Sequence, residues 1–537
     1  MSLSSTTLDR DAIHNSNNMV TSSSHLEKST VAPPKVPPFS YEEKRNILFY
    51  VLGIMCYKFG LESFNGTIKA LALDRFDKNF ASQTYTYAGY LDGFNQAAQC
   101  IGSIMIAPLV RRFPTRTVLA FAIVVFGIVS SVGMILEAAT GGKSPQQSST
   151  GKAIPGTWDS RLVIVIFTFS GLTHGMVELI RRIIPADIVG GNVLKLKRMD
   201  SIVHIVYEIG GTSGAFFATF MALRMGKAFA PIATPIAFAI AAALWSRITI
   251  PKTAANAGMS TMRDGNRNVV VAVGSAFAAF GASILEGGRI IFTHRRFSWL
   301  ILGYSLPLVL HRYLENGLAA NYAKLVLKES AYGSIMVGGS NFGELLGAVF
   351  VFLFTTVIKT PLPWLRLDAV TLSIAWVFYK RTPESLGTSP LGAAWILAAI
   401  LVPISFGWAA GDVSLAAFIQ SHVSRLKNTN PKVSALGAVM AFLYVTYIIA
   451  YAIVSPVIGN WLDGLPKDTR VDTYFRNIAG IAFSCAGVVI FATTFLPKGS
   501  RKFNPTLEED YPEEHEEDEQ DEIAKSKNQD IINQIAL

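Results

Sequence analysis

Residues Thr117–Leu136 read TVLAFAIVVFGIVSSVGMIL, a stretch of twenty residues without one charged side chain. A helix of about twenty apolar residues is long enough to cross the hydrocarbon core of a bilayer, which is about 30 Å thick. Pro231–Trp245 and Ile478–Leu496 are further long apolar blocks. Such uninterrupted blocks predict membrane-spanning α-helices, because transmembrane β-strands read as short segments of alternating hydrophobicity.

The whole composition agrees with a membrane protein. Apolar residues make up 50% of the 537 residues and charged residues 16%, and the mean hydropathy is +0.37. The three cysteines, Cys56, Cys100 and Cys485, lie in apolar segments and form no Cys-x-x-Cys pair. A disulfide framework and a cysteine-rich metal site are therefore not expected, and the sequence indicates no cofactor.

Hydropathy along the chain predicts an all-α integral membrane protein with twelve transmembrane helices in two six-helix bundles. The first six spans are expected near residues 47–71, 86–109, 117–137, 161–183, 201–223 and 230–247. The second six are expected near residues 298–322, 333–356, 364–379, 391–417, 434–460 and 477–496. The two bundles then occupy residues 47–247 and 298–497.

Polar segments flank and separate the two bundles. Residues 1–46 are rich in Ser, Thr and Asn and are expected to form a disordered cytoplasmic tail. Residues 498–537 form a second expected tail, with eleven acidic residues between Glu508 and Glu522. Between the bundles, residues 248–297 form a basic cytoplasmic linker that includes Arg263 and Arg267. Its apolar segment Val269–Leu285 is rich in Ala and Gly, so we predict a helix at the membrane surface rather than a thirteenth span.

The Lys and Arg residues concentrate in every second loop, and this bias predicts that both termini lie in the cytoplasm. An even number of spans agrees with that orientation. Basic residues beside anionic cytoplasmic lipid explain the net charge of +9, so a nucleic-acid partner is not expected. We predict a plasma-membrane location in preference to an internal membrane.

Polar side chains recur inside the predicted spans, where they are costly and normally face a bundle interior or a watery cavity. The third and sixth spans of each set carry no charged residue in their middles, which predicts apolar outer helices around a central polar pathway. The candidate residues for binding a substrate or coupling ion are Lys58, Glu62, Asn95, His174, Glu178, His204, Glu208, His311, Arg312, Glu315, Asn316, Asn341, Glu344 and Asp412.

The pattern His-x-x-x-Glu occurs three times, at His174 and Glu178, His204 and Glu208, and His311 and Glu315. Residues four apart share a helix face. Because His titrates near neutral pH and a desolvated Glu can be shifted towards it, each pair is suited to proton handling. Each pair is also suited to a fixed tie between helices, and the sequence leaves both interpretations open.

The two sets of six spans, the basic central loop and the charge-free third helices resemble the major facilitator superfamily over residues 47–497. The signature loop of that family reads roughly Gly-x-Leu-x-Asp-Arg-x-Gly-Arg-Lys, and the matching stretch is Ala107-Pro-Leu-Val-Arg-Arg-Phe-Pro-Thr-Arg116. Arg112 and Arg116 fit basic positions, whereas Arg111 replaces the acid, so the charge-relay role of that acid is not carried over. The long polar tails resemble those of eukaryotic, fungal-type members.

The resemblance implies a substrate site between the two bundles near the midplane. It also implies that the first and seventh spans are counterparts that border this cavity. Lys58, Glu62, His311, Glu315 and Asn316 are therefore expected to shape the substrate or coupling site. The implied activity is secondary active transport of a small organic solute by alternating access, with proton coupling left open and no enzyme activity. A monomer in the lipid bilayer is expected.

Two other classes of function stay open. A solute sensor or scaffold can keep a transporter fold, and the two polar tails are suited to recruiting partners. A membrane-embedded enzyme acting on lipid is the third interpretation, although the sequence has no His-Glu-x-x-His, Gly-x-Ser-x-Gly or Walker A motif.

Overall fold

The computed structural model describes residues 38–189, 193–249, 269–354, 357–358, 360–423, 435–497 and 499–504. The expected tails lie mostly outside these residues, and the linker residues Arg263 and Arg267 lie wholly outside them. The described residues form helices and one isolated β-bridge, between Lys143 and Ile154. The predicted all-α fold is confirmed.

The N-terminal half contains the first six spans. They are α1 (Tyr41–Asn79), α2 (Thr84–Arg112), α3 (Thr115–Ala139), α4 (Leu162–Val189), α5 (Val193–Met225) and, after the short η1 (Ala230–Ile232), α6 (Ala233–Ser246). α1 begins inside the segment expected as a tail because a capping box starts it. Glu43 N donates to Ser40 Oγ at 3.2 Å, and Ser40 N donates to Glu43 Oε2 at 2.7 Å.

The C-terminal half contains the other six spans, four of which combine several helical segments. Span 7 is η2 (Ile301–Ser305), α10 (Leu306–Tyr313), η3 (Leu314–Leu318) and α11 (Ala319–Leu325); span 8 is η4 (Ser330–Tyr332) and α12 (Gly333–Phe354); span 9 is α13 (Leu362–Thr371) and η5 (Leu372–Phe378). Spans 10 and 11 are α14 (Pro390–Val423) and α15 (Ala435–Gly464), and span 12 is α16 (Arg470–Tyr474), η6 (Phe475–Ala482) and α17 (Phe483–Thr493). η2, η3 and η6 are π-helical.

Two helix pairs join the halves: α2 packs against α15, and α5 packs against α12. Glycines allow these backbones to approach closely, because a Cβ on Gly89 would collide with Pro456, and a Cβ on Gly459 would collide with the Tyr85 carbonyl. α3, α6, α13 and α17 make their main contacts within their own half. The third and sixth helices of each half thus lie away from the inter-half contacts, as expected.

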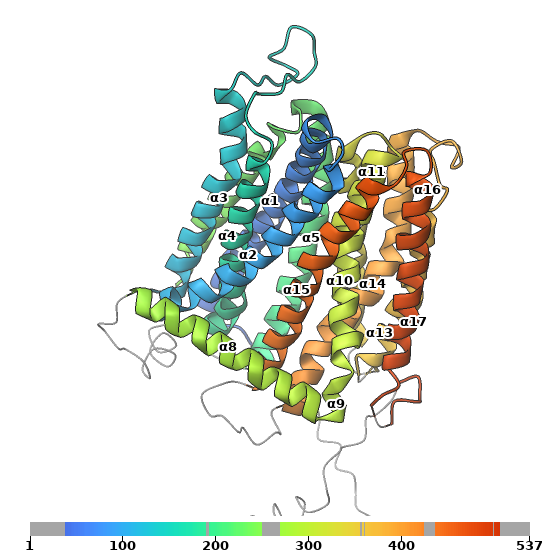
Figure 1. Ribbon diagram of the computed structural model, residues 1–537. Coiled ribbons are helices and arrows are strands. Elements are labelled where there is room, and N and C mark those ends of the chain that lie inside the picture. The colour runs from blue at the N-terminus through green and yellow to red at the C-terminus, as the bar shows by residue number, and fades with distance from the viewer. Residues whose placement is uncertain are drawn as a thin grey trace, which may run out of the picture. The chain divides into compact units, whose positions relative to one another are not determined.

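We call the end of the bundle where α1 begins the tail side, and the opposite end the loop side. The helix α8 (Val269–Thr293) crosses the tail side of α2 and α15 instead of running along them, and the short α9 (Arg295–Ser298) follows it (Figure 1). Its Gly287 and Gly288 pack against Ala438 and Phe442 near the start of α15. α8 is apolar enough to span a membrane by length and composition alone. Its crossing direction favours a surface helix, which stays a prediction.

The expectation that the middle of span 9 carries no charge is wrong. α13 buries Arg366 and Asp368, which are 6% and 0% exposed. His311 on α10 reaches Asp368, with 2.8 Å between Nε2 and Oδ1. Arg366 Nη1 donates to the carbonyl of Lys502, after α17, at 2.7 Å. Both charged groups therefore have partners inside the C-terminal half, and a hydropathy profile gives no information on such contacts.

Candidate functional site

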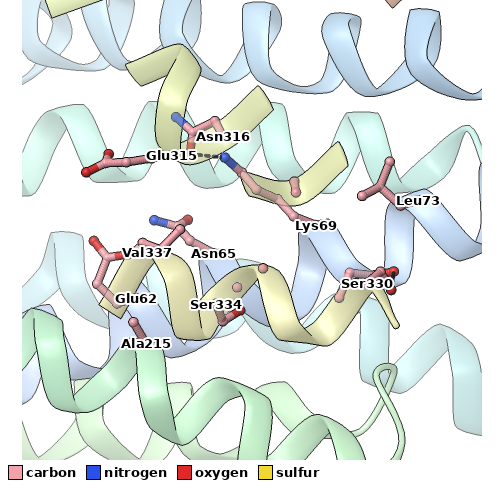
Figure 2. Close-up of a pocket in the computed structure, with 14 residues that line it drawn as sticks. Glu62, Asn65, Lys69, Leu73, Ala215, Glu315, Asn316, Ser330, Ser334 and Val337 are labelled. Carbon is pink, nitrogen blue, oxygen red and sulfur yellow. Dashed lines mark hydrogen bonds between the residues drawn. The ribbon is translucent and has the colours of Figure 1, made fainter. Parts of the chain in front are cut away.

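A small polar cavity of about 30 Å³ lies between the two halves. Figure 2 shows side chains from both halves around it. The polar groups that line it are Glu62, Asn65 and Lys69 on α1, Glu315 and Asn316 on η3, Ser330 on η4 and Ser334 on α12. Glu62, Glu315 and Asn316 thus occupy the position expected for the candidate site.

One polar stripe on α1 forms the N-terminal wall of the cavity. Lys58, Glu62, Asn65 and Lys69 follow one another at intervals of four, three and four residues, which places them on one helix face. Lys58 Nζ lies 2.6 Å from Glu62 Oε1, and both residues are buried. Lys69 crosses the cavity to donate to Asn316, as the dashed line in Figure 2 marks. The stripe therefore connects the two halves.

The π-helical η3 forms the opposite wall. Glu315 is 6% exposed. It lies 3.3 Å from Arg312 Nη1 and accepts a 2.7 Å hydrogen bond from Ser340 Oγ on α12. The Arg312 side chain is 46% exposed. π-helical turns often occur at functional sites, which agrees with this placement.

A second polar group lies beside the Lys58 and Glu62 pair, where α5 meets α12. Glu208 and Asn341 are each 3% exposed. Glu208 Oε2 and Asn341 Nδ2 are buried without a hydrogen-bond partner among the described residues. A Cβ placed on Gly211 of α5 would lie 2.7 Å from Lys58 Cε and 3.3 Å from Asn341 Nδ2. Lys58, α5 and Asn341 are therefore in direct proximity.

Two predicted site residues of the C-terminal half lie away from the cavity lining. His311 pairs with Asp368 rather than with Glu315, and its ring stacks on Trp408 at 5.1 Å between centroids. Asp412 accepts a 2.7 Å hydrogen bond from the Tyr304 hydroxyl. These contacts tie helices together within one half.

The remaining candidates lie within the N-terminal half. Glu178 lies 2.6 Å from Arg181 Nε and 3.6 Å from His174 Nε2, and it accepts a 3.0 Å hydrogen bond from Tyr207. Asn95 Nδ2 donates to the Phe167 carbonyl at 2.6 Å, which joins α2 to α4. His204 is half-buried on α5 and does not line the cavity. The cavity thus gathers a minority of the predicted residues.

Sequence reasoning missed Asn65, Lys69, Ser330 and Ser334. The spacing of the polar residues that starts at Lys58 indicates Asn65 and Lys69, because these residues continue one polar face of α1 over about three helical turns. The two serines carry no such signal, since small hydroxyl residues are common at helix contacts in membranes.

Ion pairs close the loop side of the cavity. Asp74 at the end of α1 contacts Lys227, and it lies 3.0 Å from Lys324 of α11. Lys227 in turn lies 2.6 Å from Glu329, and Lys324 lies 2.9 Å from Asp77. Each lysine therefore has acidic partners that link the N-terminal half to the C-terminal half.

A helix cap supplied by the other half adds to this closure. Gln83, at the N-cap of α2, makes no side-chain cap hydrogen bond. Asp463 of α15 instead accepts from the backbone N–H groups of Tyr85 and Thr86 at 3.2 and 2.7 Å and from the Thr86 hydroxyl at 2.8 Å. The carboxylate satisfies exposed N–H groups and faces the positive end of the α2 dipole.

In the part of the chain that the structure describes, the tail side shows no equivalent contact between the halves. The Tyr447 hydroxyl donates to Gln96 Oε1 at 2.9 Å, midway along the contact between α2 and α15. Beyond it towards the tail side, no hydrogen bond or ion pair joins one described residue of the N-terminal half to one of the C-terminal half. Among the described residues, polar contacts between the halves thus lie on the loop side and midway along the bundle.

Neither a protein-family model nor a curated protein sequence matches this chain. Solved structures match its fold. The xylose transporter XylE from E. coli, in a partially occluded inward-open conformation, aligns with a TM-score of 0.56 and 16% identity over 86% of this chain and 100% of that chain. The nucleoside transporter NupG aligns with a TM-score of 0.53 and 14% identity over 84% of this chain and 100% of that chain.

A third solved structure is the peptide transporter POT in complex with alafosfalin. It aligns with a TM-score of 0.51 and 14% identity over 83% of this chain and 93% of that chain. At identities this low, the likeness is one of fold.

Proposed function

We propose that this chain, which has the fold of the major facilitator superfamily, is a secondary active transporter that moves a small organic solute by alternating access. The matched structures are named as transporters of xylose, nucleosides and peptides, so they support the class of activity without specifying the solute. The observation that carries the proposal is the polar cavity between the two halves, with ion pairs and a helix cap that join the halves on its loop side.

Polar contacts that join the halves on one side of a central cavity support alternating access, because a transporter must expose one central site to each side in turn. The contacts that seal the loop side are ion pairs, a helix cap and hydrogen bonds, which water replaces readily when the halves separate. The Lys and Arg distribution favours a cytoplasmic tail side.

The charged pairs of the cavity supply a means of coupling solute to conformation. Lys58 with Glu62, and Arg312 with Glu315, neutralise each other while no solute is bound. An arriving polar solute competes for one member of a pair, and it does so differently in the two conformations. Such differential contact is what allows a ligand to shift a conformational equilibrium.

Alternating access is tested with two spin-label pairs in a variant whose three cysteines are replaced by serine. One pair joins Lys78→Cys to Lys328→Cys on the loop side, and the other joins Thr117→Cys to Val357→Cys on the tail side; all four positions are exposed. A thermal-shift screen of the purified full-length protein against metabolite classes first supplies the solute.

The solute should change the two distance distributions in opposite directions, one pair separating as the other approaches. A solute that binds and leaves both distributions unchanged would contradict transport and favour a sensor or scaffold.

Proton coupling is tested at Glu315, which Arg312 and Ser340 hold at the cavity wall. Glu315→Gln keeps the shape of the side chain and removes its charge, so we expect lost uphill accumulation with solute exchange retained. Glu384→Gln, in an exposed loop, is the matched control and should behave as the unmodified protein. If Glu315→Gln protein still concentrates solute with normal pH dependence, Glu315 is not the coupling group.

We further propose a monomer in the plasma membrane with both termini cytoplasmic. Ser149→Cys on the loop side and Thr293→Cys at the end of α8 are both exposed. A membrane-impermeant maleimide added to intact cells should label the first position and not the second. The reverse result would overturn the orientation.

A further inference from the structure

The cations around the cavity already have counter-charges. Lys58, Lys69 and Arg312 lie 2.6, 3.0 and 3.3 Å from Glu62, Asp92 and Glu315, respectively. Each of these pairs is formally neutral. An incoming anion would therefore meet no cation without a partner among these groups.

Two further carboxylates, those of Glu208 and Glu344, form no ion pair with a described residue. The cations that act on them, Lys58, Arg181 and Arg312, are already paired with Glu62, Glu178 and Glu315. Glu208 on α5 is 3% exposed, and its Oε2 has no hydrogen-bond partner among the described residues. Glu344 on α12 makes no ion pair or hydrogen bond with another described residue. Glu208 and Glu315 repel its charge, and Arg312 and Lys58, which already have acidic partners, attract it. Burying a carboxylate without a partner is costly, so this arrangement favours a positively charged ligand.

Two uncharged polar atoms next to Glu208 also have no partner among the described residues. They are Thr212 Oγ1, one helical turn after Glu208, and Asn341 Nδ2 on α12. Asn341 is 3% exposed and approaches α5 at Gly211, between these two residues. Acceptors from α5 and a donor from α12 thus converge beside the Lys58 and Glu62 pair.

We propose that Glu208, Thr212, Asn341 and Glu344 form a subsite for a protonated amine that carries a neighbouring hydrogen-bond acceptor, such as an amino alcohol. The ammonium N–H groups donate to Glu208 and Thr212, and the acceptor atom receives the Asn341 amide N–H. Glu344 supplies the second negative charge from the C-terminal half. This inference rests on the proposed transport function and names the class of its solute.

Other ligand classes fit these groups less well. A neutral polyol satisfies Thr212 and Asn341 but leaves the charge of both carboxylates uncompensated. An anion is repelled by Glu208 and Glu344. A proton on each carboxylate neutralises the charge but leaves Asn341 and Thr212 without partners, which costs free energy in a buried site. An organic ammonium with an acceptor satisfies all four side chains.

The test measures thermal unfolding of the full-length protein in detergent with matched probes. Ethanolamine, N-methylethanolamine and 2-amino-1,3-propanediol are the amines, ethylene glycol and sorbitol the neutral compounds, and glycolate and succinate the anions. We expect at least one amine to raise Tm by about 2 °C or more at saturation, and the other compounds to have no effect. Glu208→Gln should weaken binding of that amine by about 10- to 100-fold.

The control variant Glu384→Gln should bind the amine as the unmodified protein does. If Glu208→Gln protein does not fold, Thr212→Val, which keeps the charge, should weaken amine binding by about fivefold. The inference is overturned if no amine stabilises the protein, if a polyol or anion does so equally well, or if amine binding survives Glu208→Gln unchanged.

Uptake into proteoliposomes separates this inference from the proposed function. Amine binding that depends on Glu208, without amine accumulation, supports the subsite and contradicts transport. Accumulation of a neutral or anionic solute supports transport and contradicts the subsite.

Discussion

The loop side and the tail side of this protein use polar contacts differently. On the loop side, Asp74 and Asp463 bind groups of the opposite half. On the tail side, Glu43 binds Lys195 and Arg366 binds the carbonyl of Lys502, each within its own half. Contacts within a half make that half rigid, whereas contacts between halves set which side of the cavity is open. Breaking a contact within a half should therefore change the free energy of unfolding. Breaking a contact between the halves should change the equilibrium between conformations, and both quantities can be measured.

The largest effect is expected from a loop-side contact that stays within one half. Arg75 pairs with Glu137, and its guanidinium lies 3.9 Å from the ring centroid of Trp158. Both charged residues are buried, so Arg75→Ala leaves Glu137 uncompensated and should lower the free energy of unfolding by roughly 3–5 kcal/mol. Chemical unfolding in micelles measures the change. Lys152→Ala, in an exposed loop nearby, is the control and should change the free energy of unfolding by no more than about 0.5 kcal/mol. If Arg75→Ala lowers the free energy of unfolding by less than about 1 kcal/mol, the pair of Arg75 and Glu137 does not stabilise the N-terminal half as proposed.

A smaller effect, on conformation rather than stability, is expected at Asp74. Asp74→Asn removes the charge that Lys227 and Lys324 share, so the loop side should open more often. Partly exposed ion pairs contribute about 1 kcal/mol each or less. We expect an impermeant maleimide from the loop side to label a cavity reporter, Ala320→Cys, about tenfold faster.

The control for that experiment is Asp472→Asn, an exposed acid on the same side. Equal labelling rates in the Asp74→Asn and Asp472→Asn proteins would show that the Asp74 ion pairs do not hold the loop side closed.

The cap on α2 should contribute less than the ion pairs. Asp463→Ala removes an acceptor for Tyr85 and Thr86, and losing a helix cap costs about 1 kcal/mol. The population with separated loop-side spin labels should rise about fivefold. Asp468→Ala, exposed in the same loop, should leave the distances unchanged. An unchanged distribution for Asp463→Ala would mean that water caps α2 equally well.

The smallest effect is expected on the tail side. Glu43→Gln weakens the contact with Lys195 and the capping box of α1. Because both contacts stay within the N-terminal half and near its surface, the free energy of unfolding should fall by about 0.5–1 kcal/mol. Loop-side labelling of Ala320→Cys should not change. Faster labelling would show that the tail side also controls the equilibrium.

The sequence predicts the spans because each must supply about twenty apolar residues to the bilayer. It also predicts the polar character of the first and seventh spans, since charges at Lys58, Glu62 and Glu315 stand out in apolar surroundings. Partners on different spans are not predictable in this way. His311 has an acid four residues later on its own span, yet it pairs with Asp368 of α13, because the fold of the C-terminal half brings that carboxylate within 2.8 Å.

The contacts between the halves on the loop side are also not predictable from the sequence. Asp463 lies at the end of its helix, where an acid is ordinary, and its partners are backbone N–H groups more than 370 residues earlier. Because nearly every residue type has a backbone N–H group, the residue types at Tyr85 and Thr86 do not indicate this contact. Only the packing of α2 against α15 brings the two together.

Because Asp463 of α15 caps α2, the length of α2 depends on the conformation of the whole protein. When α15 moves away on the loop side, the N–H groups of Tyr85 and Thr86 lose the Asp463 carboxylate, and Gln83 provides no replacement. The first turn of α2 then frays, and these two amides exchange their hydrogens with solvent. Each cycle melts and re-forms one helical turn, so amide exchange at Tyr85 and Thr86 measures the fraction of time that the mouth of the pathway is open.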